Sequence, residues 1–323
     1  MKKIIIILTF VLLTQSVWAT MPVNTFSIVG YDPATGEVGV AVASKYFAVG
    51  SVVPWAKADV GAIATQAWVN ADYGIIGLEL LEKGMSPGEV VDSLTKADTL
   101  SSRRQLGIID NKGRSSSFTG KDCMNWAGGM TGINCAAQGN ILVSKDVVAK
   151  MVEAFENTKA ELGAKLLAAL LAGDAAGGDS RGRQSAALYV VKNEPGQRYD
   201  REIDIRVDDN PQPFKEIARL YHISSAMSHL EKASLLNQKG DLMGAVNEAR
   251  LSVQAGPELP ETYYDLACYL SLSGETEEAM ENIATALRMA PSYKSMAAND
   301  SDLTALRKLK KFQELTRVPS EAK

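Results

Sequence analysis

The chain has 323 residues, of which 46% are hydrophobic and 22% are charged, and its formal net charge is −4 at pH 7. This composition excludes disordered, collagen-like and coiled-coil proteins, and the acidic balance excludes a dedicated nucleic-acid-binding protein. The length predicts one large domain followed by a smaller one.

The first nineteen residues have the pattern of a secretory signal peptide. Lys2 and Lys3 precede the apolar run 4–13, and residues 17–19 (VWA) place small side chains at the positions that signal peptidase recognises. The apolar run is shorter than the roughly 20 residues that span a bilayer. We therefore predict that residues 1–19 are removed, that the protein is exported to a periplasm, and that the mature chain has no membrane span.

Residues 20–215 show strands grouped between helices. Strands are predicted at residues 25–30, 37–44, 60–67, 105–110, 114–119, 185–191 and 201–207. Helices are predicted at 73–83, 87–96 and 146–172 with a break near Gly163, and loops at 120–140 and 173–183. Because the strands are grouped rather than alternating singly with helices, we predict antiparallel sheets with segregated helices, an α+β fold.

From residue 216 onward the sequence is helical and contains an internal repeat. Four pairs of residues are 34 positions apart, namely Ala233 and Ala267, Gly240 and Gly274, Ala245 and Ala279, and Pro257 and Pro291. This period is typical of tetratricopeptide repeats. We predict an all-α module at 216–323, with repeats at about 226–259 and 260–293 and a capping helix at 301–315, supported by a helix at 211–223. Such a module would bind a protein or peptide partner.

Histidine is absent from the first 221 residues, since the chain contains only His222 and His229. Nucleophilic triads that use histidine are therefore excluded from the first domain. The cysteines lack metal-binding spacing and no phosphate-binding glycine motif is present, so we predict no metal and no cofactor. Cys123 and Cys135 either form a disulfide or are, like Cys268, small buried residues.

A nucleophile that is activated without histidine remains available. A free α-amino group has a pKa of about 7.7–8.0 and can take the proton from the hydroxyl of its own residue. This chemistry needs a Thr, Ser or Cys that begins a strand and is exposed by cleavage, and Thr25 begins the first predicted strand. The alternative is that Thr25 is an ordinary β-branched strand residue.

Nine segments of the first domain resemble one known family in combination. They are residues 25–29 (TFSIV), 39–44 (GVAVAS), 61–66 (GAIATQ), 104–107 (RQLG), 118–120 (FTG), 138–140 (QGN), 177–182 (GGDSRG), 184–188 (QSAAL) and 206–209 (RVDD). The family is domain of unknown function 1028, and the resemblance covers about residues 24–220. It implies a fold similar to that of N-terminal-nucleophile hydrolases, a four-layer αββα sandwich.

The sequence departs from the family pattern in front of Thr25. Simple members begin Met-Thr-Phe-Ser, so that removal of Met alone exposes the Thr. Here, cleavage after Ala19 would leave residues 20–24 in place. Either a second, autocatalytic or proteolytic, cut follows between Asn24 and Thr25, or Thr25 is not a free N-terminus.

The matched segments and their surroundings also contain polar candidates for a substrate pocket. The candidates are Ser44, Gln66, Asn70, Asn140, Asp179 and Arg181. The amide side chains could donate to an oxyanion, although hydrogen bonding at turns and strand ends is the alternative. Asp179 and Arg181 either line the pocket or form an internal ion pair.

Two hypotheses for function follow. The first is an exported hydrolase that cuts the C–N bond of a small peptide or non-peptide amide, with Thr25 as the nucleophile. The second is a catalytically silent periplasmic scaffold that binds a partner through its tetratricopeptide module. The N-terminal residue of the mature protein distinguishes them.

Overall fold

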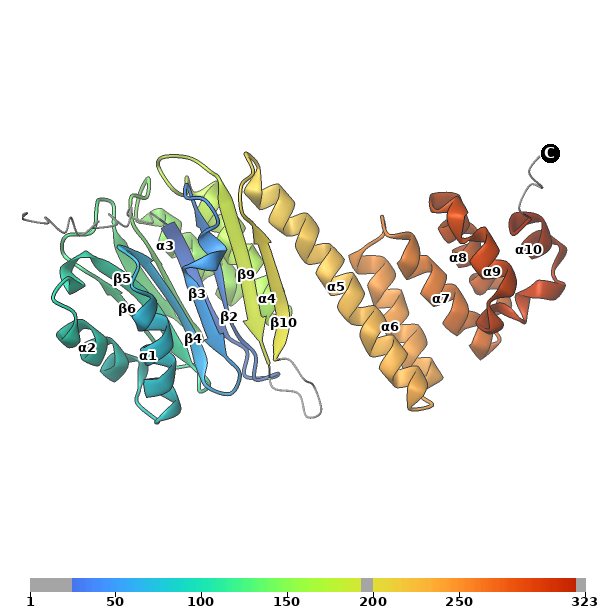
Figure 1. Cartoon of the computed structure of the whole chain (residues 1–323), viewed down its shortest axis with the longest axis horizontal. Coiled ribbons are helices and arrows are strands. Elements are labelled where there is room, and N and C mark those ends of the chain that lie inside the picture. Colours follow the sequence, from blue (N-terminus) through green and yellow to red (C-terminus); the bar gives the residue numbers. More distant parts are fainter. Residues whose placement is uncertain (1–24, 193–199, 318–323) are drawn as a thin grey trace, which may run out of the picture.

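A computed structural model describes residues 25–192 and 200–317 of the chain. Figure 1 shows a β-sandwich with helices on its outer faces, followed by an elongated helical region. The predicted signal peptide and residues 20–24 lie outside the described residues. Within the described part of the chain, no helix is both long enough and apolar enough to cross a bilayer.

The larger sheet has six antiparallel strands in the order β10-β9-β2-β1-β8-β7. Its strands are β1 (Thr25–Tyr31), β2 (Val38–Ser44), β7 (Gly128–Gly132), β8 (Cys135–Gly139), β9 (Ser185–Val191) and β10 (Arg201–Val207). Side chains alternate between the two faces of a strand. In β1, Phe26 and Ile28 pack against helices, and Val29 packs into the core between the sheets.

The smaller sheet has four antiparallel strands in the order β3-β4-β5-β6 and packs face to face on the larger one. Its strands are β3 (Pro54–Lys57), β4 (Gly61–Ala67), β5 (Arg104–Asp110) and β6 (Ser115–Thr119). Val40 and Val42 of β2 meet Ala62 and Ala64 of β4 in the core between the sheets. Small and β-branched side chains let the two sheets approach closely there.

Two helices cover the outer face of each sheet. On the smaller sheet lie α1 (Ala71–Glu82) and α2 (Pro87–Ala97), and on the larger sheet lie α3 (Asp146–Asn157) and α4 (Leu162–Ala175). Ser86 caps α2 in a capping box with Glu89, as its position before Pro87 predicts. The mixed α/β fold with antiparallel sheets and a C-terminal helical region agrees with the sequence-based prediction.

The sequence-based prediction of a loop over residues 120–140 is wrong. The segment contains β7 and β8, joined by a tight turn at Asn134, whose φ is +59°. These strands have glycine, alanine and cysteine at most positions, so they lack the β-branched pattern that identifies a strand. β3 was also missed because it is short and begins with proline. The helix break precedes Gly163, which lies inside α4.

The C-terminal region consists of helices that pack in antiparallel pairs. They are α5 (Pro213–Gln238), α6 (Leu242–Ala255), α7 (Pro260–Ser273), α8 (Thr276–Met289), α9 (Lys294–Asn299) and α10 (Lys310–Leu315). Residues 34 positions apart occupy equivalent places in the α5–α6 and α7–α8 pairs. Gly240 and Gly274 follow the first helix of each pair with φ of +83° and +89°, and Ala245 and Ala279 are fully buried in the second.

Two predicted boundaries in this region need correction. The helix predicted at 211–223 is the first part of α5, which runs without interruption to Gln238, so the predicted domain boundary at 215/216 falls inside it. The predicted capping helix at 301–315 is divided into two 3₁₀ turns, Ser301–Leu303 and Leu306–Lys308, followed by α10.

The position of α5 yields a prediction about truncation. Phe214, Ile217 and Tyr221 of α5 are buried in the core that β9, β10 and α4 form. Burial of one such side chain stabilises by about 1.5–3 kcal/mol. A variant that ends at Asn210 should therefore melt at least about 10 °C lower than one that ends at Gln238, in thermal unfolding followed by circular dichroism. Equal melting temperatures would show that α5 does not support the sandwich.

Candidate functional site

The space between the sheets has an apolar end and a polar end. Valines and alanines fill the apolar end. At the polar end, where β1 begins, lie side chains that are at most 2% exposed: Thr25, Ser27, Ser44, Gln66, Gln105, Gln138, Asn140 and Ser185. Burying a polar group is costly unless it is hydrogen bonded, and most of these polar atoms have partners, although the Gln138 Oε1 has none in the described part of the chain.

Three glutamines connect the sheets at this end. The Gln66 Nε2 donates to the Gln105 Oε1 over 2.9 Å and to the Thr25 carbonyl over 3.3 Å. The Gln138 Nε2 donates to the Ser27 Oγ over 2.6 Å, and that hydroxyl donates to the Gln66 Oε1, also over 2.6 Å. The network thus runs from β4 and β5 of the smaller sheet into β1 and β8 of the larger one.

Thr25 is held on several sides at the start of β1. Its hydroxyl donates to the Ser44 Oγ over 3.3 Å, and its carbonyl accepts from the Asn140 backbone N–H over 3.0 Å. Thr25 also pairs with Ser44 in the β1–β2 register. The position of the Thr25 hydroxyl is therefore fixed by the fold.

A hollow of about 300 Å³ lies beside Ser44. Its walls include Ser44, Lys45, Asp174, Asp179, Arg183 and Phe214. Because the Thr25 hydroxyl is bonded to the Ser44 hydroxyl, Thr25 and the hollow are parts of one candidate site. A hollow of this size accommodates a small substrate.

Asp179 fits both sequence-based interpretations, whereas Arg181 fits the internal ion pair and does not line the hollow. Asp179 lines the hollow, and its Oδ2 also accepts from the Arg181 Nη2 over 2.7 Å and from the Lys45 backbone N–H over 3.0 Å. The carboxylate therefore fixes the loop that follows α4 to the end of β2. It shapes the wall of the hollow from a paired, buried position.

The amide candidates separate into two groups. Gln66 and Asn140 belong to the network, where the Asn140 Nδ2 donates to the Gln105 Oε1 over 2.9 Å. Asn70 lies outside it, because its Oδ1 accepts from the Asp72 backbone N–H over 3.1 Å and caps α1. The structure therefore brings Thr25, Ser44, Gln66 and Asn140 together and assigns Asn70 a capping contact.

Sequence reasoning missed three network residues, Ser27, Gln105 and Gln138, and also Ser185, whose Oγ donates to the Tyr46 carbonyl and accepts from the Val49 backbone N–H. Each lies opposite another polar residue in the strand register: Ser185 faces Ser44, Ser27 faces Gln138, and Gln105 faces Gln66. The sequence does contain one sign of such a network: polar residues occupy alternate positions of an otherwise apolar strand, as Thr25 and Ser27 do in β1. Which of these residues face one another depends on the strand register, and the register is known only from the folded structure.

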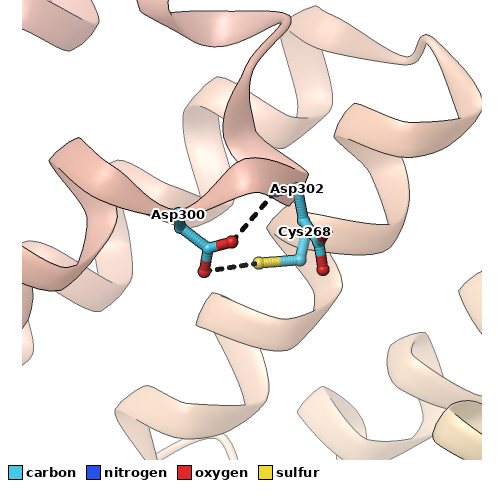
Figure 2. Close-up of side chains that lie close together, drawn as sticks. All are labelled: Cys268, Asp300 and Asp302. Carbon is cyan, nitrogen blue, oxygen red and sulfur yellow. Dashed lines mark hydrogen bonds between the residues drawn. The ribbon is translucent and has the colours of Figure 1, made fainter.

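A second polar cluster lies in the C-terminal helical region (Figure 2). Cys268 of α7 meets Asp300 and Asp302, and one ligand atom from each lies within 4.8 Å of the others. Within residues 25–192 and 200–317, this is the only group of three His, Cys, Asp or Glu side chains that lie close enough together to share a metal ion. The prediction that the chain binds no metal rested on cysteine spacing and did not consider this cluster.

The other two cysteines are unpaired thiols. Burial raises the pKa of the Cys123 thiol to about 11 and that of the Cys135 thiol to about 12. No disulfide joins Cys123 and Cys135, and of the two residues Cys135 is buried, whereas Cys123 is half-buried.

Comparison with known proteins identifies the first domain. The model of the family of unknown function DUF1028 matches residues 25–217. The chain belongs to this family. A DUF1028 crystal structure from Silicibacter pomeroyi is similar, with 32% sequence identity and a TM-score of 0.57 over 61% of this chain and 84% of that one. No curated protein matches the chain. The resemblance of the sequence to this family is thus confirmed.

The glutamine network of this DUF1028 chain predicts a large loss of stability on one substitution. The Gln105 Nε2 donates to the Gly139 carbonyl over 2.7 Å, and its Oε1 accepts from Gln66 and Asn140. Gln105→Leu leaves these groups buried without partners, so it should lower the free energy of unfolding by about 2–4 kcal/mol. Gln184→Ala, at a half-buried glutamine, should lower it by less than about 1 kcal/mol in the same urea titration. Similar losses for both would contradict the importance of the network.

The raised pKa of Asp265, on α7, predicts that the stability of the protein depends on pH. Burial raises its pKa from the ordinary 3.8 to about 6, and the carboxylates of Asp300 and Glu261 add to the effect. The pKa of Asp265 is higher in the folded protein than in the unfolded chain, so the ionised carboxylate favours unfolding. The free energy of unfolding therefore decreases as the pH rises from about 4 to about 6.

Asp265→Asn removes this loss. It should stabilise the protein by about 1–2 kcal/mol at pH 7 and have little effect at pH 4. Urea unfolding of both proteins between pH 4 and pH 8, in metal-free buffer, measures the difference. Parallel stability profiles for the two proteins would show that Asp265 is not responsible.

Proposed function

We propose that the DUF1028 domain hydrolyses the C–N bond of a small amide, with Thr25 as an N-terminal nucleophile. The observation that carries the proposal is the place of Thr25: it begins the central strand β1 and its hydroxyl bonds to Ser44, which lines the 300 Å³ hollow. The order of layers, two helices, two face-to-face sheets and two helices, supports a fold of the N-terminal-nucleophile type.

The proposed reaction uses the α-amine of Thr25 as the base. The amine takes the hydroxyl proton while Oγ1 attacks the carbonyl carbon of the amide, and the same proton then goes to the leaving nitrogen as the C–N bond breaks. Water hydrolyses the resulting ester and restores the hydroxyl. Asn140 and Gln66 bind the Thr25 carbonyl, so they are positioning residues that hold the nucleophile.

This chemistry requires that the chain be cut between Asn24 and Thr25. A peptide nitrogen has a delocalised lone pair and cannot act as a base. The proposal therefore includes removal of residues 1–19 during export to a periplasm and a second cut that releases residues 20–24.

We also propose that the C-terminal region is a tetratricopeptide module that binds a protein or peptide. The equivalent positions of Gly240 and Gly274, and of Ala245 and Ala279, in consecutive helix pairs support this assignment. In this arrangement the module selects or localises the partner, and the DUF1028 domain acts on the amide.

Substitution of Thr25 tests the proposal. Thr25→Ala should lower hydrolysis of a panel of amino-acid and short-peptide amides by at least about 10²-fold, with an unchanged circular dichroism spectrum. Thr131→Ala, at an exposed threonine of β7, is the matched control and should keep full activity. N-terminal sequencing of active periplasmic protein should find Thr25 first.

Two results would contradict the proposal. One is wild-type activity in Thr25→Ala. The other is a mature chain that begins at residue 20 and hydrolyses none of the amides, and this result would favour the catalytically silent scaffold.

A further inference from the structure

A thiol and two carboxylates converge between α7 and the segment that follows α9. Cys268, on α7, is 6% exposed. Asp300 and Asp302 lie 32 and 34 residues later in the chain, around the first 3₁₀ turn after α9. In Figure 2 the thiol points toward the Asp300 carboxylate, and the Cys268 Sγ lies 3.9 Å from the Asp300 Oδ2.

These separations are close to those of a coordinated metal ion. Zinc–sulfur and zinc–oxygen bonds of about 2.3 Å and 2.0–2.2 Å, at tetrahedral angles, place sulfur and oxygen about 3.6 Å apart. The three donor atoms lie within 4.8 Å of one another. Rotation of these side chains would have to bring the three donors onto one ion, and a water molecule would complete four-fold coordination.

The charge around the cluster is unbalanced. Burial is the main cause that raises the pKa of the Cys268 thiol, and the carboxylates of Asp300, Asp265 and Asp302 raise it further. The guanidinium of Arg307 donates through Nη2 to the Asp300 backbone carbonyl and not to its carboxylate. A cation at the cluster would compensate this excess of negative charge.

A buried hydroxyl on the same face of α7 is a further, separate observation. Tyr264, Cys268 and Ser271 are spaced four and three residues apart and therefore share one face of the helix. The Tyr264 hydroxyl donates to the Asp300 Oδ2 over 2.8 Å. The Ser271 Oγ, three residues beyond Cys268, is buried without a hydrogen-bond partner in the described part of the chain.

A purely structural role explains only part of the cluster. Asp300 accepts from the Asp302 backbone N–H over 3.0 Å and so caps the 3₁₀ turn. Capping needs Asp300 alone. It does not explain why Asp302 lies beside the thiol, or why the carboxylate of a third aspartate, Asp265, is close enough to raise the pKa of Cys268. The thiol with three carboxylates around it is the feature that capping leaves unexplained.

We propose that Cys268, Asp300 and Asp302 form a binding site for a divalent transition-metal ion of the Zn²⁺ type. A thiolate favours zinc and similar ions, whereas magnesium and calcium prefer oxygen alone. The bound ion would join α7 to the segment at 300–302 and brace the end of the helical array. The site is separate from Thr25, and the proposal is independent of the hydrolase assignment.

Cobalt titration of the full-length, untagged protein tests the site. Co²⁺ bound to a thiolate gives a near-ultraviolet charge-transfer band, which reports the sulfur ligand directly. We expect one Co²⁺ per chain, displacement by Zn²⁺, and a melting temperature at least about 5 °C higher when Zn²⁺ is in hundred-fold excess over its Kd. Absence of the band or of the shift would overturn the proposal.

Variants identify the ligands. Cys268→Ala should abolish the band, and Asp302→Asn should weaken Co²⁺ binding at least about 10-fold, by analogy with losses on changing groups around metal sites. Cys123→Ala, at the more exposed of the remaining thiols, is the matched control and should keep the band. If Cys268→Ala fails to fold, Cys268→Ser replaces it, because a serine hydroxyl gives no thiolate band. A band that persists in the Cys268 variants, or disappears in Cys123→Ala, would place the metal elsewhere and refute the site.

Discussion

Hydrogen bonding of buried amides is the constraint on which the polar end of the sandwich depends. Gln105 contributes an acceptor to Gln66 and Asn140 and a donor to the Gly139 carbonyl. An unpaired buried polar group costs more than a hydrogen bond contributes, so the two sheets can meet at this end in only one relative position. The close approach is visible at Gly107, where a Cβ would collide with the Gln138 side chain. The network thus sets the sheet packing, and the sheet packing places Thr25.

The division of the core into two ends explains how polar side chains come to lie beside the hollow. The apolar end, made of valines and alanines, is stabilised by burial and close packing, whereas the polar end lies next to the hollow. Thr25 and Ser44 lie where these environments meet, beside the hollow lined by Asp179. The apolar end contributes the stability that lets the polar end keep its buried amides.

The sequence predicted the parts of the fold that local pattern determines. The alternation in β1 and the Ser86–Pro87 start of α2 depend on neighbouring residues alone, and so do the 34-residue repeat positions. β7 and β8 could not be predicted, because their small residues are selected by contact with the other sheet rather than by strand propensity. Of the site, Thr25, Ser44, Gln66 and Asn140 were predicted. Gln105 and the Cys268 cluster were not, because their partners are set by register and by helix packing.

Helix α5 connects the candidate site to the helical region through one rigid element. At its start, Phe214 lines the hollow beside Ser44 and stacks on Phe26, with ring centroids 6.1 Å apart. About two turns further along, the Tyr221 hydroxyl donates to the Glu161 Oε1 over 2.5 Å and holds the helix to the start of α4. Its last turns form the first helix pair with α6. A 26-residue helix is about 39 Å long, so α5 links the first helix pair of the C-terminal region to the wall of the hollow through one continuous helix.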